Sequence, residues 1–225
     1  MPIKPLSIIV AGASGRMGAR VEALARADAR FEVAARITID HPLMARDLES
    51  AGAIVDFSAP SASIAFAAAA ARARKPIVIG TTGWTAAQTK KLAAFSRKTP
   101  IFLSPNFSRG VSVLFELAAL ASRLLPGCSA AIVETHHDRK KDAPSGTALK
   151  LAAATGRAKV PTLSQRLGDV VGDHTLTLAG PCERLELTHR ADSRDVFARG
   201  ALDAALWLRA RRPGLYGMKD LLGLR

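Results

Sequence analysis

Cysteine and aromatic residues are scarce in this sequence. The two cysteines, Cys128 and Cys182, lie far apart and neither has a CxxC neighbour, so the pattern predicts free thiols rather than a disulfide framework or a zinc site. One tyrosine and two tryptophans leave little material for a surface on which nucleic-acid bases could stack. Disulfide-rich and zinc-bound classes are therefore disfavoured.

Long hydrophobic runs are also missing. A stretch such as 64–71 stops at an arginine, well short of the roughly 20 residues that a membrane-spanning helix needs. We therefore expect no membrane partner. The first residues run directly into a strand-like segment and leave no room for a secretory signal, which predicts a cytoplasmic protein.

Acidic residues are outnumbered by basic ones. The chain has 32 Lys and Arg against 19 Asp and Glu, a net charge of +13 that favours anionic partners and requires nucleic acid to be considered. The basic residues are scattered, however, and cluster only at 139–141 and 209–212. This pattern favours small phosphorylated or carboxylated ligands over nucleic acid.

The remaining composition is that of a globular protein, because 225 residues with 48% hydrophobic content can bury a core in one mid-sized domain or two small ones. In the first half, short apolar runs alternate with longer Ala-rich stretches, which predicts a parallel sheet covered by helices on both faces. The roughly fifteen residues at 38–52 are too few for a long crossover helix. We expect strands at 6–11, 31–37, 53–57, 76–80 and 101–103, and helices at 15–27, 61–74 and 85–98.

After Asn106 the pattern changes to one amphipathic helix followed mainly by strands, which predicts a second, α+β domain. A last helix, at about 196–211, carries apolar residues at helical spacing and is expected to return to the first domain. The expected elements of the second domain are the helix 111–125, a helical run at 148–154, and strands 129–135, 163–167, 174–178 and 183–188.

The first predicted strand leads into Gly12-x-x-Gly15-x-x-Gly18 and then into a helix. Glycine at such a junction lets the backbone approach a pyrophosphate, and the helix N-terminus offers N–H groups and a positive dipole end. Ala13 stands where the first glycine of GxGxxG would be, and an ordinary tight turn is the alternative. Two further junctions, 80–83 and 104–108, are expected to face the same crevice, because ligands of open α/β sheets bind beyond the carboxyl ends of the strands.

The densest chemistry lies at 134–148, where two histidines, three cations and three carboxylates precede a Pro-Ser-Gly-Thr turn. Adjacent His136 and His137 on a strand would point to opposite faces, so we predict no metal site. The hydroxyls and backbone N–H groups of 145–147 suit a carboxylate, and an imidazole and an ammonium beside them could support proton transfer. A solvated charged loop with a capped helix remains the alternative reading of these residues.

The pattern Glu134-x-His136-x-x-x-Lys140-x-Asp142-x-Pro144-Ser145-Gly146-Thr147-Ala148 resembles the signature of the 4-hydroxy-tetrahydrodipicolinate reductases, also called dihydrodipicolinate reductases, of the diaminopimelate and lysine pathway. The resemblance implies an oxidoreductase with a Rossmann-type, doubly wound dinucleotide-binding domain at 1–107 plus 196–225. It also implies a substrate-binding and tetramerisation domain at 108–195, and hence a homotetramer. Shorter motifs of the family follow in order along nearly the whole chain, at 12–18, 56–58, 80–83, 106–108, 166–174 and 185–189.

The implied reaction transfers hydride from NADPH or NADH to dehydrated 4-hydroxy-tetrahydrodipicolinate, a small dicarboxylate, and gives tetrahydrodipicolinate. By position, His136 corresponds to the acid/base histidine of the family and Lys140 to its proton-donating lysine. The substrate-binding positions are His137, Ser145, Gly146 and Thr147. The cofactor-binding positions are Gly12, Ala13, Ser14, Gly15, Arg16, Met17, Gly80, Thr81, Thr82, Ser104, Pro105, Asn106 and Phe107. Thr38 is added to them as the residue expected beside the ribose.

Cofactor preference depends on the end of the second strand. Thr38 occupies the place where an NAD-selective Rossmann fold often has an acid that binds the ribose and repels a 2′-phosphate. Arg36, on the same strand face, could reach that phosphate, whereas Asp40 could take over the role of the acid. We predict that NADPH is used at least as well as NADH.

Rival functions need different residues. A semialdehyde dehydrogenase would need a nucleophilic cysteine, but Cys128 and Cys182 follow turn-like Pro-Gly and Gly-Pro pairs. A non-catalytic NAD(P)-binding sensor of the same fold, or a basic nucleic-acid binder, would not need His136 and Lys140 beside a Ser-Gly-Thr turn. Substrate-dependent oxidation of NAD(P)H separates these alternatives.

Overall fold

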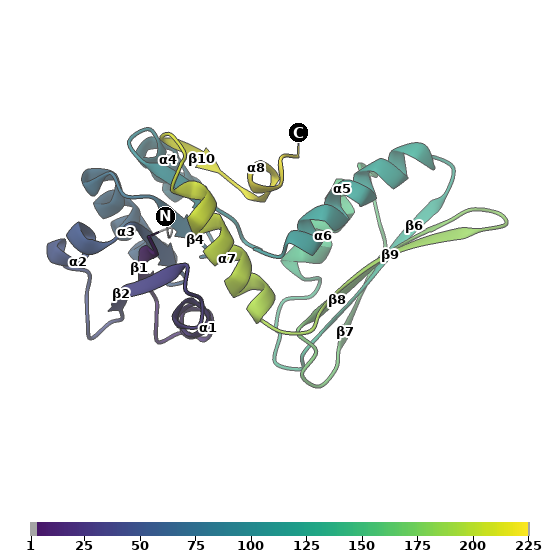
Figure 1. Ribbon diagram of the computed structural model, residues 1–225. Coiled ribbons are helices and arrows are strands. Elements are labelled where there is room, and N and C mark those ends of the chain that lie inside the picture. The colour runs from purple at the N-terminus through teal and green to yellow at the C-terminus, as the bar shows by residue number, and fades with distance from the viewer. Residues whose placement is uncertain (1–3, 225) are drawn as a thin grey trace. The chain divides into compact units, whose positions relative to one another are not determined.

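The computed structural model describes residues 4–224 (Figure 1). The chain divides into two compact units, each described by itself below. Unit 1 contains 4–107 together with 195–224, and unit 2 contains 108–194. Unit 1 is therefore built from two segments of the chain, and unit 2 from the segment between them.

Unit 1 is a six-stranded parallel sheet in the order β10-β5-β4-β3-β1-β2. The chain moves from β1 to β2 on one side and then to β3 on the other, so the order reverses beside β1. In open α/β sheets the ligand crevice lies beyond the carboxyl ends of the strands at such a reversal. The strands are β1 (Leu6–Ala11), β2 (Phe31–Ile37), β3 (Ala53–Asp56), β4 (Ile77–Ile79), β5 (Pro100–Leu103) and β10 (Gly214–Tyr216).

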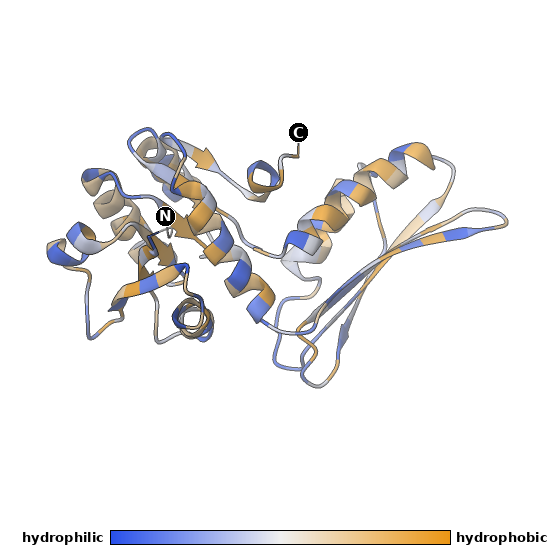
Figure 2. Ribbon diagram, in the orientation of Figure 1, coloured by the Kyte–Doolittle hydropathy of each residue, from blue (hydrophilic) through white to orange (hydrophobic). Residues whose placement is uncertain are grey.

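Helices cover both faces of this sheet because successive strand residues point to opposite sides. Ile8 and Val10 of β1 belong to the hydrophobic cluster that α1 and α7 close, while Ile9 belongs to the cluster that α3 and α4 close. Figure 2 shows hydrophobic residues along α7, whose inner side is buried. The helices of unit 1 are α1 (Arg16–Arg26), α2 (Ala45–Ser50), α3 (Pro60–Ala73), α4 (Ala86–Ser96), α7 (Asp195–Leu208) and α8 (Met218–Leu222).

Unit 2 is a four-stranded mixed sheet in the order β7-β6-β8-β9, with two helices packed on one face. Strands β6 and β7 are parallel, whereas β8 is antiparallel to both β6 and β9. Leu114 of α5 and Leu151 of α6 pack against Ile132 and Leu176 of the sheet. The elements are α5 (Arg109–Leu124), β6 (Ser129–His136), α6 (Gly146–Ala154), β7 (Thr162–Arg166), β8 (Gly172–Ala179) and β9 (Arg184–Ala191).

The predicted α/β class with a second α+β unit is confirmed, and most predicted elements agree with the structure to within three residues. Three short elements were not predicted, namely α2, β10 and α8. Cys128 and Cys182 are both free thiols, as expected. None of the helices in the described part of the chain combines the length and hydrophobicity that crossing a bilayer requires.

Candidate active site

The glycine-rich turn after β1 can accept no larger residues at its two ends. Gly12 has a φ of +74°, and a Cβ there would lie 2.5 Å from the carbonyl oxygen of Phe57. A Cβ on Gly18 would lie 2.1 Å from the carbonyl oxygen of Gly12, so the helix and the turn are in direct backbone contact. Helix α1 begins at Arg16 without a side-chain cap, which leaves its N-terminal N–H groups suited to a phosphate.

A cavity of about 520 Å³ opens beside this turn at the carboxyl ends of β1 and β3. Its walls bring together four of the residues predicted to bind the cofactor, Gly12, Ser14, Gly15 and Thr38. The other walls are mainly hydrophobic, as a nucleoside requires. They are formed by Ile37, Ile39, Pro42, Leu43, Phe57, Ser58, Ala59, Ala62 and Phe66.

The remaining predicted cofactor residues do not line this cavity. Ala13 is buried, and Arg16 and Met17 form the first turn of α1. The others follow the neighbouring strands: Gly80, Thr81 and Thr82 after β4, and Ser104, Pro105, Asn106 and Phe107 after β5.

Several side chains in these last two segments already have internal partners. The hydroxyl of Thr81 accepts a hydrogen bond from Ser63 at 2.8 Å, and that of Ser104 donates to the carbonyl oxygen of Asn106 at 2.5 Å. The ring of Phe107 is buried beside Phe102. The side chains of Thr81, Ser104 and Phe107 therefore take part in the internal packing and hydrogen bonding of unit 1.

Arg36, which could reach a 2′-phosphate, has a protein partner in this structure. Its Nε donates to Glu22 on α1 at 2.6 Å, so the guanidinium is already paired with a carboxylate. Thr38 does line the cavity, and its hydroxyl accepts a hydrogen bond from the backbone N–H of His41 at 3.2 Å. Asp40 lines a different hollow, together with Arg36.

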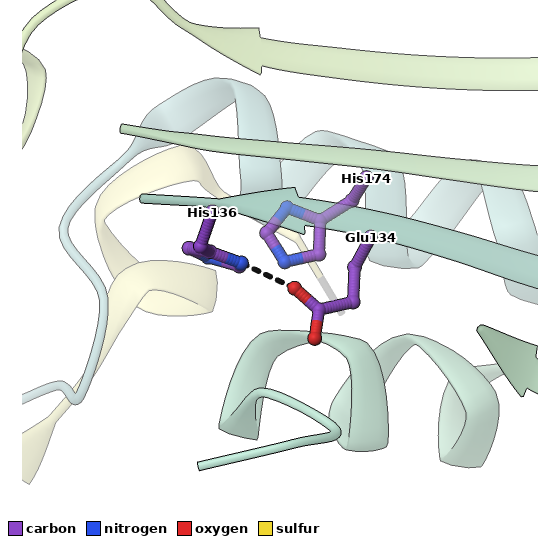
Figure 3. Close-up of side chains that lie close together, drawn as sticks. All are labelled: Glu134, His136 and His174. Carbon is purple, nitrogen blue, oxygen red and sulfur yellow. Dashed lines mark hydrogen bonds and ion pairs between the residues drawn. The ribbon is translucent and has the colours of Figure 1, made fainter. Parts of the chain in front are cut away.

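In unit 2, Glu134, His136 and His174 converge in the interior, as Figure 3 shows. Glu134 and His136 lie two residues apart on β6 and so point to the same face of the sheet. His174 is opposite Glu134 in the register of β6 and β8. A carboxylate oxygen of Glu134 is hydrogen-bonded to Nδ1 of His136, and the two imidazoles meet edge to face with centroids 5.1 Å apart.

Arg166 on β7 connects this cluster to the loop that follows β6. Its two terminal nitrogens each lie 3.2 Å from the same oxygen of Glu134. The guanidinium also donates to the carbonyl oxygens of Lys140 and Asp142. Burial would raise the pKa of Glu134, but hydrogen bonds from Ser164, Arg166 and His136 hold it below its ordinary value, so the carboxylate is ionised.

The two buried imidazoles are harder to protonate than a histidine in water. Burial lowers the pKa of His136, the neighbouring Glu134 carboxylate partly opposes this, and the charges of Lys140 and Arg166 lower it further. Burial likewise lowers the pKa of His174 to about 4, with a further contribution from the charge of His136. His174 is therefore neutral at physiological pH.

The predicted carboxylate-binding residues lie at the start of α6. Ser145 is the N-cap, and its hydroxyl accepts from the N–H of Ala148 at 3.1 Å, while Gly146 and Thr147 form the first turn. Lys140, at the other end of the loop, is paired with Asp142 through contacts of 2.8 and 2.9 Å. The predicted His137 directly follows β6 and is half-buried.

Glu134, His136 and His174 place one possible metal-ligand atom each within 4.8 Å of one another. The carboxylate of Glu134 is already neutralised by Arg166 and hydrogen-bonded to His136. A cation entering this cluster would therefore meet a neighbouring guanidinium and lose the carboxylate's existing bonds. We retain the hydrogen-bonded interpretation of the cluster.

The sequence alone assigned no role to Arg166 or His174. Their signal was the pattern Arg166-x-Gly168-x-x-x-Gly172-x-His174, which matches the family but says nothing of contacts. The contacts of Arg166 and His174 follow from strand pairing, because β7 places Arg166 opposite His136 and β8 places His174 opposite Glu134.

Comparison with known proteins identifies the family of the chain. Two family models match, dihydrodipicolinate reductase N-terminus over residues 6–107 and dihydrodipicolinate reductase C-terminus over residues 110–222. The 4-hydroxy-tetrahydrodipicolinate reductase of Anaeromyxobacter dehalogenans is 40% identical, over 97% of this chain and 98% of that protein. The one from Xanthomonas campestris is 41% identical, over 99% of this chain and 100% of that protein.

Among solved structures, dipicolinate-bound dihydrodipicolinate reductase from Paenisporosarcina sp. TG-14 has the same fold. It superposes with a TM-score of 0.80 at 22% identity and covers 96% of this chain and 99% of that one. The likeness extends further than a common fold, because two family models match and relatives are 40% identical over nearly the full length. The chain belongs to the dihydrodipicolinate reductase family.

Proposed function

We propose that this chain is a 4-hydroxy-tetrahydrodipicolinate reductase of the diaminopimelate route to lysine, using NADH or NADPH. The observation that carries the proposal is the cluster in unit 2, where a buried histidine, a lysine and a helix start suited to a carboxylate are joined by hydrogen bonds. Relatives with this activity are about 40% identical over nearly the whole chain.

The cofactor fits the first unit on structural grounds. At Gly12 and Gly18 a Cβ would collide with backbone, so glycine keeps the turn open to a close approach. The uncapped start of α1 and the cavity beside it match a pyrophosphate and a nucleoside. When bound, NADH or NADPH supplies the hydride.

The protein residues would supply charge, orientation and a proton. Ser145, Gly146 and Thr147 would hold a substrate carboxylate at the N-terminus of α6, with His137 as a further contact. Lys140 would balance the negative charge of the dicarboxylate, and His136 or Lys140 would donate the proton that completes the reduction. Asp142 would keep the ammonium of Lys140 in place until substrate arrives.

His136→Gln tests this assignment. We expect kcat to fall by about 10²-fold or more with little change in the KM for NAD(P)H, since the imidazole belongs to the unit 2 cluster rather than to the glycine-rich turn. The measurement is NAD(P)H oxidation with freshly generated substrate. Wild-type turnover in the variant would remove His136 from the mechanism.

Lys140→Ala provides the companion test. Losing the ammonium should lower kcat and raise the KM for the dicarboxylate together, because its charge is assigned to both steps. An absence of substrate-dependent oxidation in the wild type would instead favour a non-catalytic NAD(P)-binding sensor.

The proposal includes a homotetramer assembled through unit 2, in the cytoplasm and without nucleic acid as a partner. Supporting assembly, Val133 and Leu163 are register partners on the sheet face opposite the helices, and both are exposed. Exposed hydrophobic side chains of this kind mark interaction surfaces. Supporting the location, both cysteines are free thiols. Sedimentation equilibrium tests the tetramer.

The functional division of the chain is also proposed, with 1–107 plus 196–225 binding the dinucleotide and 108–195 binding substrate. The compact units support these boundaries, since they change at Ser108 and Asp195.

A further inference from the structure

Glu134 joins two parts of the proposed site. Its side chain is fully buried, with one carboxylate oxygen bonded to Nδ1 of His136 and the other accepting the backbone N–H of Ser145 at 3.2 Å. The first partner is the proposed acid/base histidine, and the second is the N-cap of the proposed carboxylate-binding helix. One side chain therefore touches both the acid/base group and the substrate cradle.

Arg166 makes this buried carboxylate possible. A lone charge in a protein interior is costly, but a guanidinium contact and several hydrogen bonds compensate. Both terminal nitrogens of Arg166 lie 3.2 Å from the oxygen that also binds Ser145. The carboxylate therefore remains ionised, and its hydrogen-bond partners come from β6, β7 and the start of α6.

The contact with Glu134 also determines how His136 is presented. A carboxylate bonded to Nδ1 requires the proton on that nitrogen, so Nε2 is the ring atom left for substrate chemistry. The ring lies against Gly172, where a Cβ would be 2.9 Å from Nε2. Glu134 on one side and the bare backbone of Gly172 on the other leave the imidazole one orientation.

We propose that Glu134 is a positioning residue that orients His136 for proton transfer and at the same time fixes the start of α6 for carboxylate binding. This inference rests on the proposed function and adds a residue that acts through two others.

The charges around His136 predict a pH signature. It is faced by Glu134 from β6, by Arg166 from β7, by His174 from β8, and by Lys140 and Asp142 from the loop. Glu134 is the anion in direct contact, so removing its charge leaves mainly cationic neighbours. The pKa of His136 must then fall.

The central experiment is Glu134→Gln, which keeps the size of the side chain and removes its charge. We expect the pH above which kcat/KM declines to move down by about one unit or more, because His136 loses its proton earlier. We also expect the dissociation constant for dipicolinate, an unreactive dicarboxylate probe, to rise about tenfold, because the start of α6 loses an anchor.

Three matched variants separate positioning from structural damage. His136→Gln should lower kcat and leave dipicolinate affinity unchanged, since it removes the contact of Glu134 with His136 but keeps the one with Ser145. Glu134→Asp retains the charge, so its pH profile should stay within a few tenths of a unit of wild type even where turnover drops. His189→Phe breaks a different, part-buried hydrogen bond of unit 2, the one with Ser108, and should lower the melting temperature without moving the pH profile.

Histidine ¹⁵N NMR gives a readout that needs no activity. Wild-type His136 should carry its proton on Nδ1, and Glu134→Gln should give a mixture of tautomers, with assignment by the His136→Gln variant. An unchanged tautomer together with an unchanged pH profile in Glu134→Gln overturns the inference, whatever its effect on stability. Glu134→Asp carries the same test if the Gln variant does not fold, because a profile displaced by a unit despite the retained charge also contradicts it. Failure of the proposed function appears differently, as a wild type that does not oxidise NAD(P)H with substrate.

Discussion

The hydroxyl of Ser145 lies 3.2 Å from Nε2 of His174. The other helix of unit 2 begins in the same way, since Ser108 caps α5 and lies 3.1 Å from Nε2 of His189. The two histidines are register partners on β8 and β9. Each helix of this unit is therefore attached to the sheet at its N-cap by a serine–histidine pair.

Ser145→Ala and Ser108→Ala should have similar effects on stability but different effects on binding. Each removes an N-cap and should lower the free energy of unfolding by about 1 kcal/mol, measured by urea denaturation. Only Ser145→Ala should weaken dipicolinate, because only α6 carries the proposed carboxylate site. Equal dipicolinate affinity in both variants would place the carboxylate elsewhere.

Stability should decline as the pH falls from 6.5 toward 4 because of His174. Its pKa is near the ordinary 6.5 when unfolded and about 4 when folded, so below 6.5 the unfolded chain takes up a proton that the folded chain does not. His174 lowers the free energy of unfolding by nothing above pH 6.5, and by an amount that grows to on the order of 3 kcal/mol below pH 4. His174→Gln should flatten this part of the curve in urea titrations at several pH values; a curve parallel to wild type contradicts the assignment.

Gly172→Ala should damage turnover more than stability. The added methyl would lie 2.9 Å from Nε2 of His136 and displace the ring. We expect kcat to fall by about tenfold or more, with dipicolinate affinity largely kept. Gly127→Ala is the control, since a Cβ there meets nothing within 4 Å. A normal kcat in Gly172→Ala would show that the ring can shift without consequence.

Cofactor choice should respond to Thr38 rather than to Arg36 or Asp40. Thr38 lines the cavity proposed for the nucleoside, whereas Arg36 is paired with Glu22 and lines another hollow together with Asp40. We expect the wild type to use NADPH at least as well as NADH, and Thr38→Asp to shift the ratio of kcat/KM values toward NADH by about tenfold or more. Asp40→Asn should leave that ratio unchanged. A strong NADH preference in the wild type would contradict this account.

Local pattern was enough to predict the strands and the glycine-rich turn. The predicted bounds of β1 and β2 coincide with the structure because each is a short, largely apolar segment that ends at a turn. Helix α2 has only six residues, none of them buried, so the sequence carries no periodic signal for it. The signature at 134–148 likewise singled out His136 and Lys140 as candidate site residues, and it also contains Glu134.

Side-chain pairing between distant segments was beyond sequence reasoning. The contacts of Glu134 with Arg166 and of Ser145 with His174 depend on the register of three strands, which a single sequence does not reveal. The same limit applies to Arg36, whose partner Glu22 on α1 lies in a distant segment of the chain.

The two-segment construction of unit 1 has a consequence for synthesis on the ribosome. Buried residues of α7 complete one hydrophobic cluster of its sheet, and β10 pairs with β5 at its edge. Until the ribosome has made residues 108–194 and then α7, the nascent first part of unit 1 therefore leaves exposed the hydrophobic surface that α7 later covers. Unit 2 is continuous in sequence, so it can fold first even though it is made second, and the nucleotide-binding unit is the last part of the chain to close.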